Sequence, residues 1–134
     1  MNGLHLIAEL HDCRCARDLL HQPALLQALC RKACTVGSLT IVAEAFHAFG
    51  TAALPAGATG AVVLAESHLA IHTWPELGES GAVSLDLYVC NFSRNNCAAA
   101  ELAFLHLVNA FQPDRVDRHD LLRGALGRSK ANMA

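Results

Sequence analysis

A serine between an acid and a histidine ends an apolar run in the middle of the chain. The run covers residues 60–65, and Glu66, Ser67 and His68 follow it directly. Serine beside histidine suggests nucleophilic hydrolysis, but a hydrolase nucleophile lies on a strained turn that needs flanking glycines, and these are missing here. The sequence around Ser67 therefore argues against a hydrolase nucleophile at this position.

The nearby histidines and the cysteines are the candidates for metal binding. Residues 68–74 are predicted to be extended, so His68 and His72 would lie about 13 Å apart at roughly 3.3 Å per residue. This spacing argues against a shared metal ion, and we predict no metal cofactor. Four of the six cysteines, Cys13, Cys15, Cys30 and Cys34, could alternatively form a zinc site, but a Cys-x-Cys pair does not have the usual zinc spacing. We expect all six cysteines, including Cys90 and Cys97, to be free thiols.

The periodicity of apolar residues predicts the elements that position Ser67. Strands are predicted at residues 3–10, 39–49, 61–65, 68–74, 82–90 and 115–122, with helices at 18–33 and 98–111. Pro23 falls near the start of the first helix, Gly37 is expected to end it, residues 50–60 are predicted to form a loop, and residues 127–134 a flexible tail. This order predicts a single α+β domain over residues 1–134, a two-layer sandwich with an antiparallel or mixed sheet and two helices on one face. The other face of the sheet must be exposed to solvent or covered by a second copy of the chain.

The predicted hairpin places one cysteine beside Ser67. If the turn is centred on Gly78 and Glu79, Cys90 lies directly opposite Ser67. His72 is five residues further along the strand, about 16 Å away at roughly 3.3 Å per residue, and its side chain has the opposite parity.

These residues carry a resemblance to a known family. The chain resembles the bacterial S-adenosylmethionine decarboxylases in its early Gly3-x-His5-Leu6, in Glu44-Ala45-Phe46-His47-x-Phe49, in Pro55-x-Gly57-x-Thr59-Gly60, in Glu66-Ser67-His68-Leu69-x-Ile71-His72-Thr73-Trp74-Pro75-Glu76, and in Asp86-Leu87-Tyr88-x-Cys90. The resemblance covers most of the domain.

The resemblance implies a proenzyme that cuts itself between Glu66 and Ser67. In the family the serine hydroxyl attacks the preceding carbonyl to form an ester, and elimination leaves a covalent pyruvoyl group at the new amino terminus. Residues 1–66 would become a β chain and residues 67–134 an α chain. The pyruvoyl group would form a Schiff base with the substrate and accept electrons as carbon dioxide leaves.

The resemblance also implies roles for the other matched residues. Cys90 would donate a proton during decarboxylation, His72 would accept a proton during processing, and Thr59 would assist processing. Phe49, Trp74 and Glu76 would bind the substrate, Phe49 by stacking on adenine and Glu76 through the ribose hydroxyls. Because His72 is far from Ser67 in one chain, we expect a two-fold homodimer with four layers, αββα, in which each site is shared between subunits.

Three hypotheses for the function remain open. The first is decarboxylation of S-adenosylmethionine for spermidine synthesis. The second keeps the pyruvoyl chemistry but acts on ornithine or arginine, since Ala48, the loop before Pro55 and the turn at residues 77–81 depart from the family pattern beside the expected pocket. The third is a non-catalytic thiol or zinc-binding module.

Charge and hydropathy limit the partners and the location. The formal net charge of -2 provides no basic surface for nucleic acid or anionic lipid. The first apolar stretch is interrupted by charged residues and histidines, and the weakly polar run at residues 51–65 is too short to span a membrane. We therefore expect a cytoplasmic protein without membrane or nucleic-acid partners.

Overall fold

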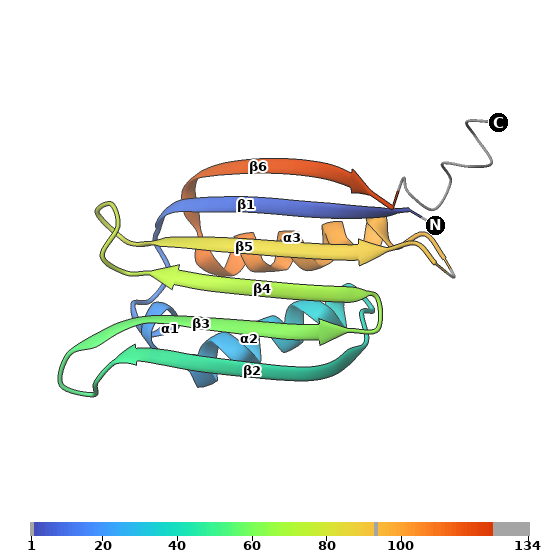
Figure 1. Cartoon of the computed structure of the whole chain (residues 1–134). Coiled ribbons are helices and arrows are strands. Elements are labelled where there is room, and N and C mark those ends of the chain that lie inside the picture. The colour runs from blue at the N-terminus through green and yellow to red at the C-terminus, as the bar shows by residue number, and fades with distance from the viewer. Residues whose placement is uncertain (1, 93, 125–134) are drawn as a thin grey trace.

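The structure, a computed structural model, describes residues 2–92 and 94–124. Six antiparallel strands form one sheet in the order β2-β3-β4-β5-β1-β6, and three helices cover one of its faces (Figure 1). This confirms the predicted α+β two-layer sandwich, with an antiparallel rather than mixed sheet. The elements are β1 (Gly3–Cys13), α1 (Asp18–His21), α2 (Pro23–Val36), β2 (Ile41–Gly50), β3 (Pro55–Leu64), β4 (Ser67–Trp74), β5 (Ala82–Cys90), α3 (Cys97–Phe111) and β6 (Pro113–Arg123). The predicted tail at residues 127–134 lies outside the described residues.

Burial alternates with a period of two along the central strands, because one face of the sheet packs against the helices and the other does not. On β5 the alternate residues Val83, Leu85, Leu87 and Val89 are buried, whereas those between them are half-buried. The buried face packs on apolar side chains of α2 and α3, including Leu26, Cys30, Ala103, Leu107 and Phe111. The opposite face, called the free face below, lies toward the viewer in Figure 1. On β4 and β5 its residues are the half-buried and exposed ones that alternate with the buried ones, such as His68, His72, Ser84 and Asp86.

The single helix predicted at residues 18–33 is wrong, because the chain forms two helices there. Gln22 separates α1 from α2 and has extended backbone angles, φ −99° and ψ 111°. The ring of Pro23 clashes with a helical residue before it, so Gln22 leaves the helical region and a new helix begins at the proline. The sheet is therefore covered by three helices instead of two.

The helix end predicted at Gly37 is confirmed, but for a different physical reason. Gly37 has an ordinary φ of −81°, and the left-handed conformation belongs to Ser38, with φ 57°. A Cβ atom on Gly37 would lie 2.6 Å from the carbonyl oxygen of Ala99 in α3. The glycine therefore allows α2 and α3 to approach closely.

Strand β3 is longer than predicted and turns directly into β4. The second half of the predicted loop at residues 50–60 belongs to β3, which begins at Pro55 and pairs with both β2 and β4. Proline is accepted at the first residue of a strand because it donates no ladder hydrogen bond there. A two-residue turn at Ala65 and Glu66, which the sequence pattern did not indicate, then reverses the chain so that Leu64 pairs with Ser67.

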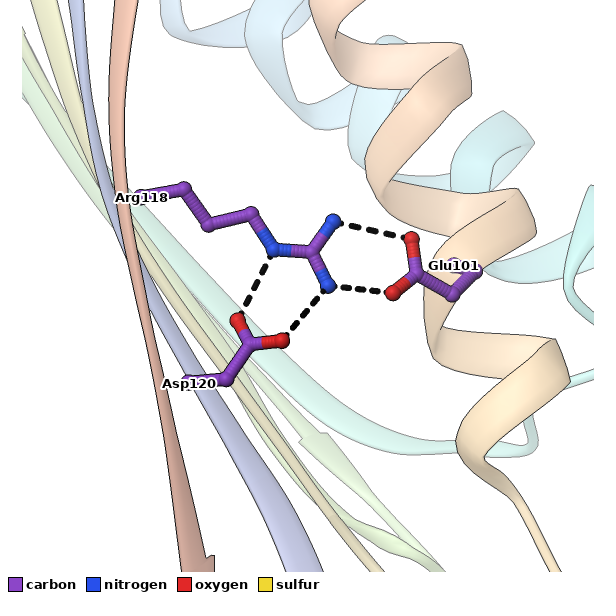
Figure 2. A network of polar contacts seen from close by, with 3 residues as sticks. All are labelled: Glu101, Arg118 and Asp120. Atoms are coloured by element: carbon purple, nitrogen blue, oxygen red, sulfur yellow. Dashed lines mark hydrogen bonds and ion pairs between the residues drawn. The ribbon is translucent and has the colours of Figure 1, made fainter.

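An ion-pair network fastens the edge strand β6 to α3 (Figure 2). Arg118 donates from Nε to Asp120 Oδ1 at 2.8 Å and from Nη1 to Glu101 Oε2 at 2.9 Å. Its guanidinium also lies 4.9 Å from the ring centre of Phe104. Hydrogen bonds from Arg118 lower the pKa of the carboxyl groups of Glu101 and Asp120.

Among the helices of the described residues, none is long and apolar enough to cross a membrane.

Replacing Arg118 by alanine is expected to cost about 1 kcal/mol of unfolding free energy at neutral pH, a modest value because the carboxylates face solvent. The pKa values of both carboxyl groups are lower in the folded chain than in the unfolded chain. The stabilisation by Arg118 is therefore complete above their unfolded pKa values, about 4, and declines as the pH falls through their folded pKa values. Denaturant titrations at neutral and at acidic pH measure it. Arg14→Ala, which removes a pair with one exposed carboxylate, is the matched control and should have a smaller effect. An Arg118→Ala loss that stays constant at acidic pH would contradict the electrostatic origin.

Candidate active site

The predicted cleavage point lies at a strained position of the backbone. Glu66 is the second residue of the turn between β3 and β4, and Ser67 is the first residue of β4. Ser67 has φ 146°, a region that residues with a side chain rarely adopt. Such a conformation costs about 1–3 kcal/mol and persists only where the surrounding structure holds it. Breaking the peptide bond before Ser67 would release this strain.

The carbonyl group of that peptide bond is held by a neighbouring strand. The backbone N–H of Cys90 donates to the carbonyl oxygen of Glu66 at 2.8 Å. The side-chain Nδ2 of Asn96, a buried residue, donates to the carbonyl oxygen of Cys90 at 2.8 Å, and the Thr40 N–H donates to Glu66 Oε1 at 2.9 Å. The Cys90 N–H would stabilise negative charge that develops on the Glu66 oxygen during an attack on this carbonyl.

The predicted hairpin register is wrong by one residue. Val89, and not Cys90, lies opposite Ser67, because the ladder of β4 and β5 runs from Ser67↔Val89 to Trp74↔Ala82. The turn of residues 75–81 fixes this register, and its centre lies half a residue before the predicted one. Cys90 is the next residue along β5, so it still neighbours the cleavage point, and its backbone makes the contact with Glu66.

The other predicted site residues gather at the opposite end of β4. A cavity of about 330 Å³ is lined by the five residues expected to assist processing or bind substrate: Phe49, Thr59, His72, Trp74 and Glu76. Ala56, Gly57, Ala58 and Thr73 complete the lining. Thr59 and His72 face each other across β3 and β4, with Thr59 Oγ1 2.5 Å from His72 Nδ1. Phe49 and Trp74 remain about half exposed, so the cavity has apolar walls open to solvent.

The predicted site residues therefore form two separate groups in one chain. Glu66, Ser67 and Cys90 lie at one end of β4, and none of them lines the cavity that contains His72 at the other end. Ser67 and His72 are five residues apart on one continuous strand, or about 16 Å at the usual rise per residue. A serine and a base must come within hydrogen-bond reach to act together. Ser67 and His72 of the same chain therefore cannot act on each other.

Of the four cysteines weighed as an alternative zinc site, three lie in the hydrophobic core and Cys15 is partly buried against it. All six cysteines are free, and Cys13, Cys30 and Cys34 are buried. Burial raises the pKa of Cys30 to about 12 and that of Cys34 to about 11, which disfavours the thiolate form of both. Within residues 2–92 and 94–124, the only group of three or more potential metal ligands is His5, His68 and Asp86.

Sequence reasoning assigned no role to Asp86 or Asn96, two polar residues that contact this region. Asp86 accepts hydrogen bonds from His5 and His68 on the free face, and Asn96 holds the Cys90 backbone. For Asp86, His5 and His68 the only signal in the sequence was a weak one, polar residues that alternate with apolar ones along predicted strands. Asn96 gave no signal beyond its position before a helix, because its contact depends on how the chain folds back onto β5.

Comparison with known proteins gives a consistent result. The profile of the family described as S-adenosylmethionine decarboxylase matches residues 4–124. The S-adenosylmethionine decarboxylase proenzyme of Thermotoga maritima is 38% identical over 114 residues, which cover 85% of this chain and 78% of that protein. The proenzyme of Hydrogenobaculum sp. is 33% identical over 96% of this chain and 86% of that protein. The crystal structure of the adenosylmethionine decarboxylase of Aquifex aeolicus superposes with a TM-score of 0.76 at 30% identity, covering 91% of this chain and 90% of that one.

The fold and these matches place the chain among the decarboxylase proenzymes. The chain belongs to the S-adenosylmethionine decarboxylase family.

Proposed function

We propose that the protein is a self-processing, pyruvoyl-dependent decarboxylase that converts S-adenosylmethionine to its decarboxylated form and carbon dioxide. The observation that carries the proposal is the Glu66–Ser67 peptide bond, which combines a strained serine with a carbonyl held by a backbone N–H. Family membership supports S-adenosylmethionine as the substrate over ornithine or arginine. The reaction supplies the aminopropyl donor of spermidine synthesis, and we expect a cytoplasmic enzyme.

Processing begins with the hydroxyl group of Ser67. Its oxygen attacks the carbonyl carbon of Glu66, the Cys90 N–H stabilises the charge on the carbonyl oxygen, and the bond to the Ser67 nitrogen breaks to leave an ester. A base then removes the α-proton of residue 67, and the bond between Cβ and the ester oxygen breaks, which frees the carboxylate of Glu66. Addition of water and loss of ammonia convert the resulting dehydroalanine into the pyruvoyl group.

The residues that line the cavity supply the base and the substrate contacts. His72, held by Thr59, accepts the α-proton during processing. Phe49 and Trp74 offer apolar surfaces for the adenine, and the carboxylate of Glu76 accepts hydrogen bonds from the ribose hydroxyls. Cys90 donates the proton that replaces carbon dioxide. A pyruvoyl group at residue 67 would supply a ketone for the substrate amine and an electron sink for the loss of carbon dioxide.

A two-fold homodimer would join the two halves of the site. Packing the free faces of two sheets would form the four-layer αββα arrangement, with His72 of each subunit at the partner's cleavage point, since the same surface is used on both sides of a two-fold axis. The exposed apolar side chains of the free face and its edges support this, including Val63 at 49% and Leu121 at 49% exposure.

Glu76→Gln is expected to raise KM for S-adenosylmethionine about tenfold to a hundredfold, because a neutral amide accepts ribose hydrogen bonds less strongly than a carboxylate. Self-cleavage should continue at the parent rate, since Glu76 takes no part in it. Steady-state kinetics and a denaturing gel measure the two effects. Glu79→Gln, in the same turn but outside the cavity lining, is the control and should match the parent. An unchanged KM for Glu76→Gln would remove its assignment.

Release of labelled carbon dioxide tests the substrate directly. The purified, cleaved protein is incubated separately with carboxyl-labelled S-adenosylmethionine, ornithine and arginine. We expect release from S-adenosylmethionine alone. Release from ornithine or arginine without S-adenosylmethionine would overturn the substrate and keep the pyruvoyl chemistry, whereas an uncleaved chain without activity would overturn both.

A further inference from the structure

Three side chains from three different strands meet beside the cleavage point on the free face. Asp86 of β5 accepts hydrogen bonds at one oxygen, Oδ1, from Nε2 of His5 on β1 and from Nε2 of His68 on β4, the latter at 3.2 Å. The ring of Tyr88 lies 5.3 Å from that of His5 and 5.9 Å from that of His68. His5 is 13% exposed, whereas His68 and Asp86 are about 40% exposed. The proposed processing and binding steps use none of these residues.

The cluster could hold a metal ion or form a hydrogen-bond network, and Arg123 distinguishes the two. Its Nη1 lies 3.3 Å from Nδ1 of His5, and its guanidinium lies 4.3 Å from the centre of the Tyr88 ring. Arginine can only donate hydrogen bonds, so Nδ1 of His5 must accept, and its proton is on Nε2. That proton points at Asp86, whereas a metal ion would need the lone pair of the same nitrogen. The contacts therefore favour a hydrogen-bond network.

The network includes His68, the residue directly after Ser67. Before cleavage, Ser67 is held by peptide bonds on both sides. After cleavage, the upstream bond is lost, and residue 67 becomes a chain end attached only through His68 and its ladder pairing with Leu64 and Val89. Chain ends fray unless they are tied down. The side chain of His68, bound to Asp86, is an attachment that cleavage does not remove.

We infer that His68 is a positioning residue that keeps the new amino terminus, and with it the pyruvoyl group, in place for decarboxylation, and that it acts through Asp86, which His5 and Arg123 hold in turn. The inference rests on the proposed function, because it concerns the group formed from Ser67. Loss of the His68 side chain should therefore affect self-cleavage and decarboxylation differently. Self-cleavage needs the uncut chain and depends little on His68, whereas decarboxylation takes place after the cut and depends on it.

The variants His68→Ala, Asp86→Ala and the double variant test the inference. We expect each single variant to cleave itself within about threefold of the parent rate and to lose about tenfold to a hundredfold in kcat, because a misplacement of about 1 Å can cost this much. KM should change less than kcat. The double variant should be no worse than either single one, since both remove the same attachment. His68→Gln, which can still donate to Asp86, should recover most of the activity.

Two controls separate positioning from stability and from loss of the cofactor. Titration with phenylhydrazine should find the same number of ketone groups per chain in every variant. His11→Ala, which removes a comparable histidine–carboxylate pair at 2.9 Å between β1 and β6, should leave both activities unchanged.

Three results would overturn the inference. In the first, the losses of kcat for His68→Ala and Asp86→Ala multiply in the double variant. In the second, His68→Ala slows cleavage and decarboxylation equally. In the third, purified protein contains stoichiometric metal that His5→Ala removes. A parent protein that cleaves itself but releases no carbon dioxide would instead contradict the proposed function, and phenylhydrazine kinetics on the cleaved variants would still test the positioning.

Discussion

Replacement of Ser67 by alanine should leave the chain in one piece and reduce decarboxylation to the uncatalysed rate, a loss of roughly 10⁶-fold or more. The expectation is this large because a single oxygen atom has two roles. It is the nucleophile that attacks the Glu66 carbonyl, and it is the leaving group whose departure creates the ketone precursor. Without it there is neither scission nor an electrophile for the substrate amine. A denaturing gel after prolonged incubation and a carbon dioxide assay measure both effects.

The variant should fold, since alanine removes only a hydroxyl group from a half-buried residue. Ser80→Ala is the matched control, because Ser80 lies in the turn between β4 and β5, away from the cut, and alanine retains the carbonyl oxygen to which Arg17 donates. It should cleave at the parent rate. Two fragments from Ser67→Ala would show that another residue starts the scission.

His72→Ala should stop processing after the first step, with a loss of about 10²–10⁴-fold in the rate of pyruvoyl formation, the usual contribution of a general base. Ester formation does not need the α-proton to leave, so the chain should accumulate as an ester at the Glu66–Ser67 junction. Hydroxylamine cleaves esters and spares peptide bonds, so it should cut this variant rapidly into two fragments. Hydroxylamine should leave Ser67→Ala intact. Normal pyruvoyl formation by His72→Ala would remove the assigned role.

Mixing the two inactive variants tests whether His72 acts on the partner subunit. In a mixed dimer, Ser67 of the His72→Ala chain faces an intact His72 of the Ser67→Ala chain, so one complete site is restored. We expect coexpression to yield pyruvoyl formation on the His72→Ala chain only. If His72 served the Ser67 of its own chain, coexpression would restore nothing.

Most strands and helices could be predicted because their apolar residues alternate with the period of the element. Two local features escaped. The reversal at Ala65 and Glu66 contains neither glycine nor proline, and the positive φ falls on Ser67, where a sequence pattern would place glycine. The break at Gln22 was missed because Pro23 is as compatible with the first turn of one helix as with the start of a second.

The cavity residues could be predicted from the family motif, and the structure brings Phe49, Thr59, His72, Trp74 and Glu76 together. The partner of Ser67 across the hairpin was misplaced by one residue because sequence alone does not fix the geometry of the turn at residues 75–81. The network around Asp86 was missed for another reason. Its members His5, His68 and Asp86 come from β1, β4 and β5, and His5 is 81 residues from Asp86 in sequence. Only the strand order β4-β5-β1 makes them neighbours.

Formation of the pyruvoyl group can be measured from the mass of the purified protein after incubation. We expect two fragments, one of residues 1–66 with a free carboxylate on Glu66, and one starting at residue 67 that is lighter by one molecule of ammonia than a fragment beginning with serine. The second fragment should also resist amino-terminal sequencing. A single uncleaved chain, or a second fragment with the full mass of a serine terminus, would contradict the formation of a pyruvoyl group at Ser67.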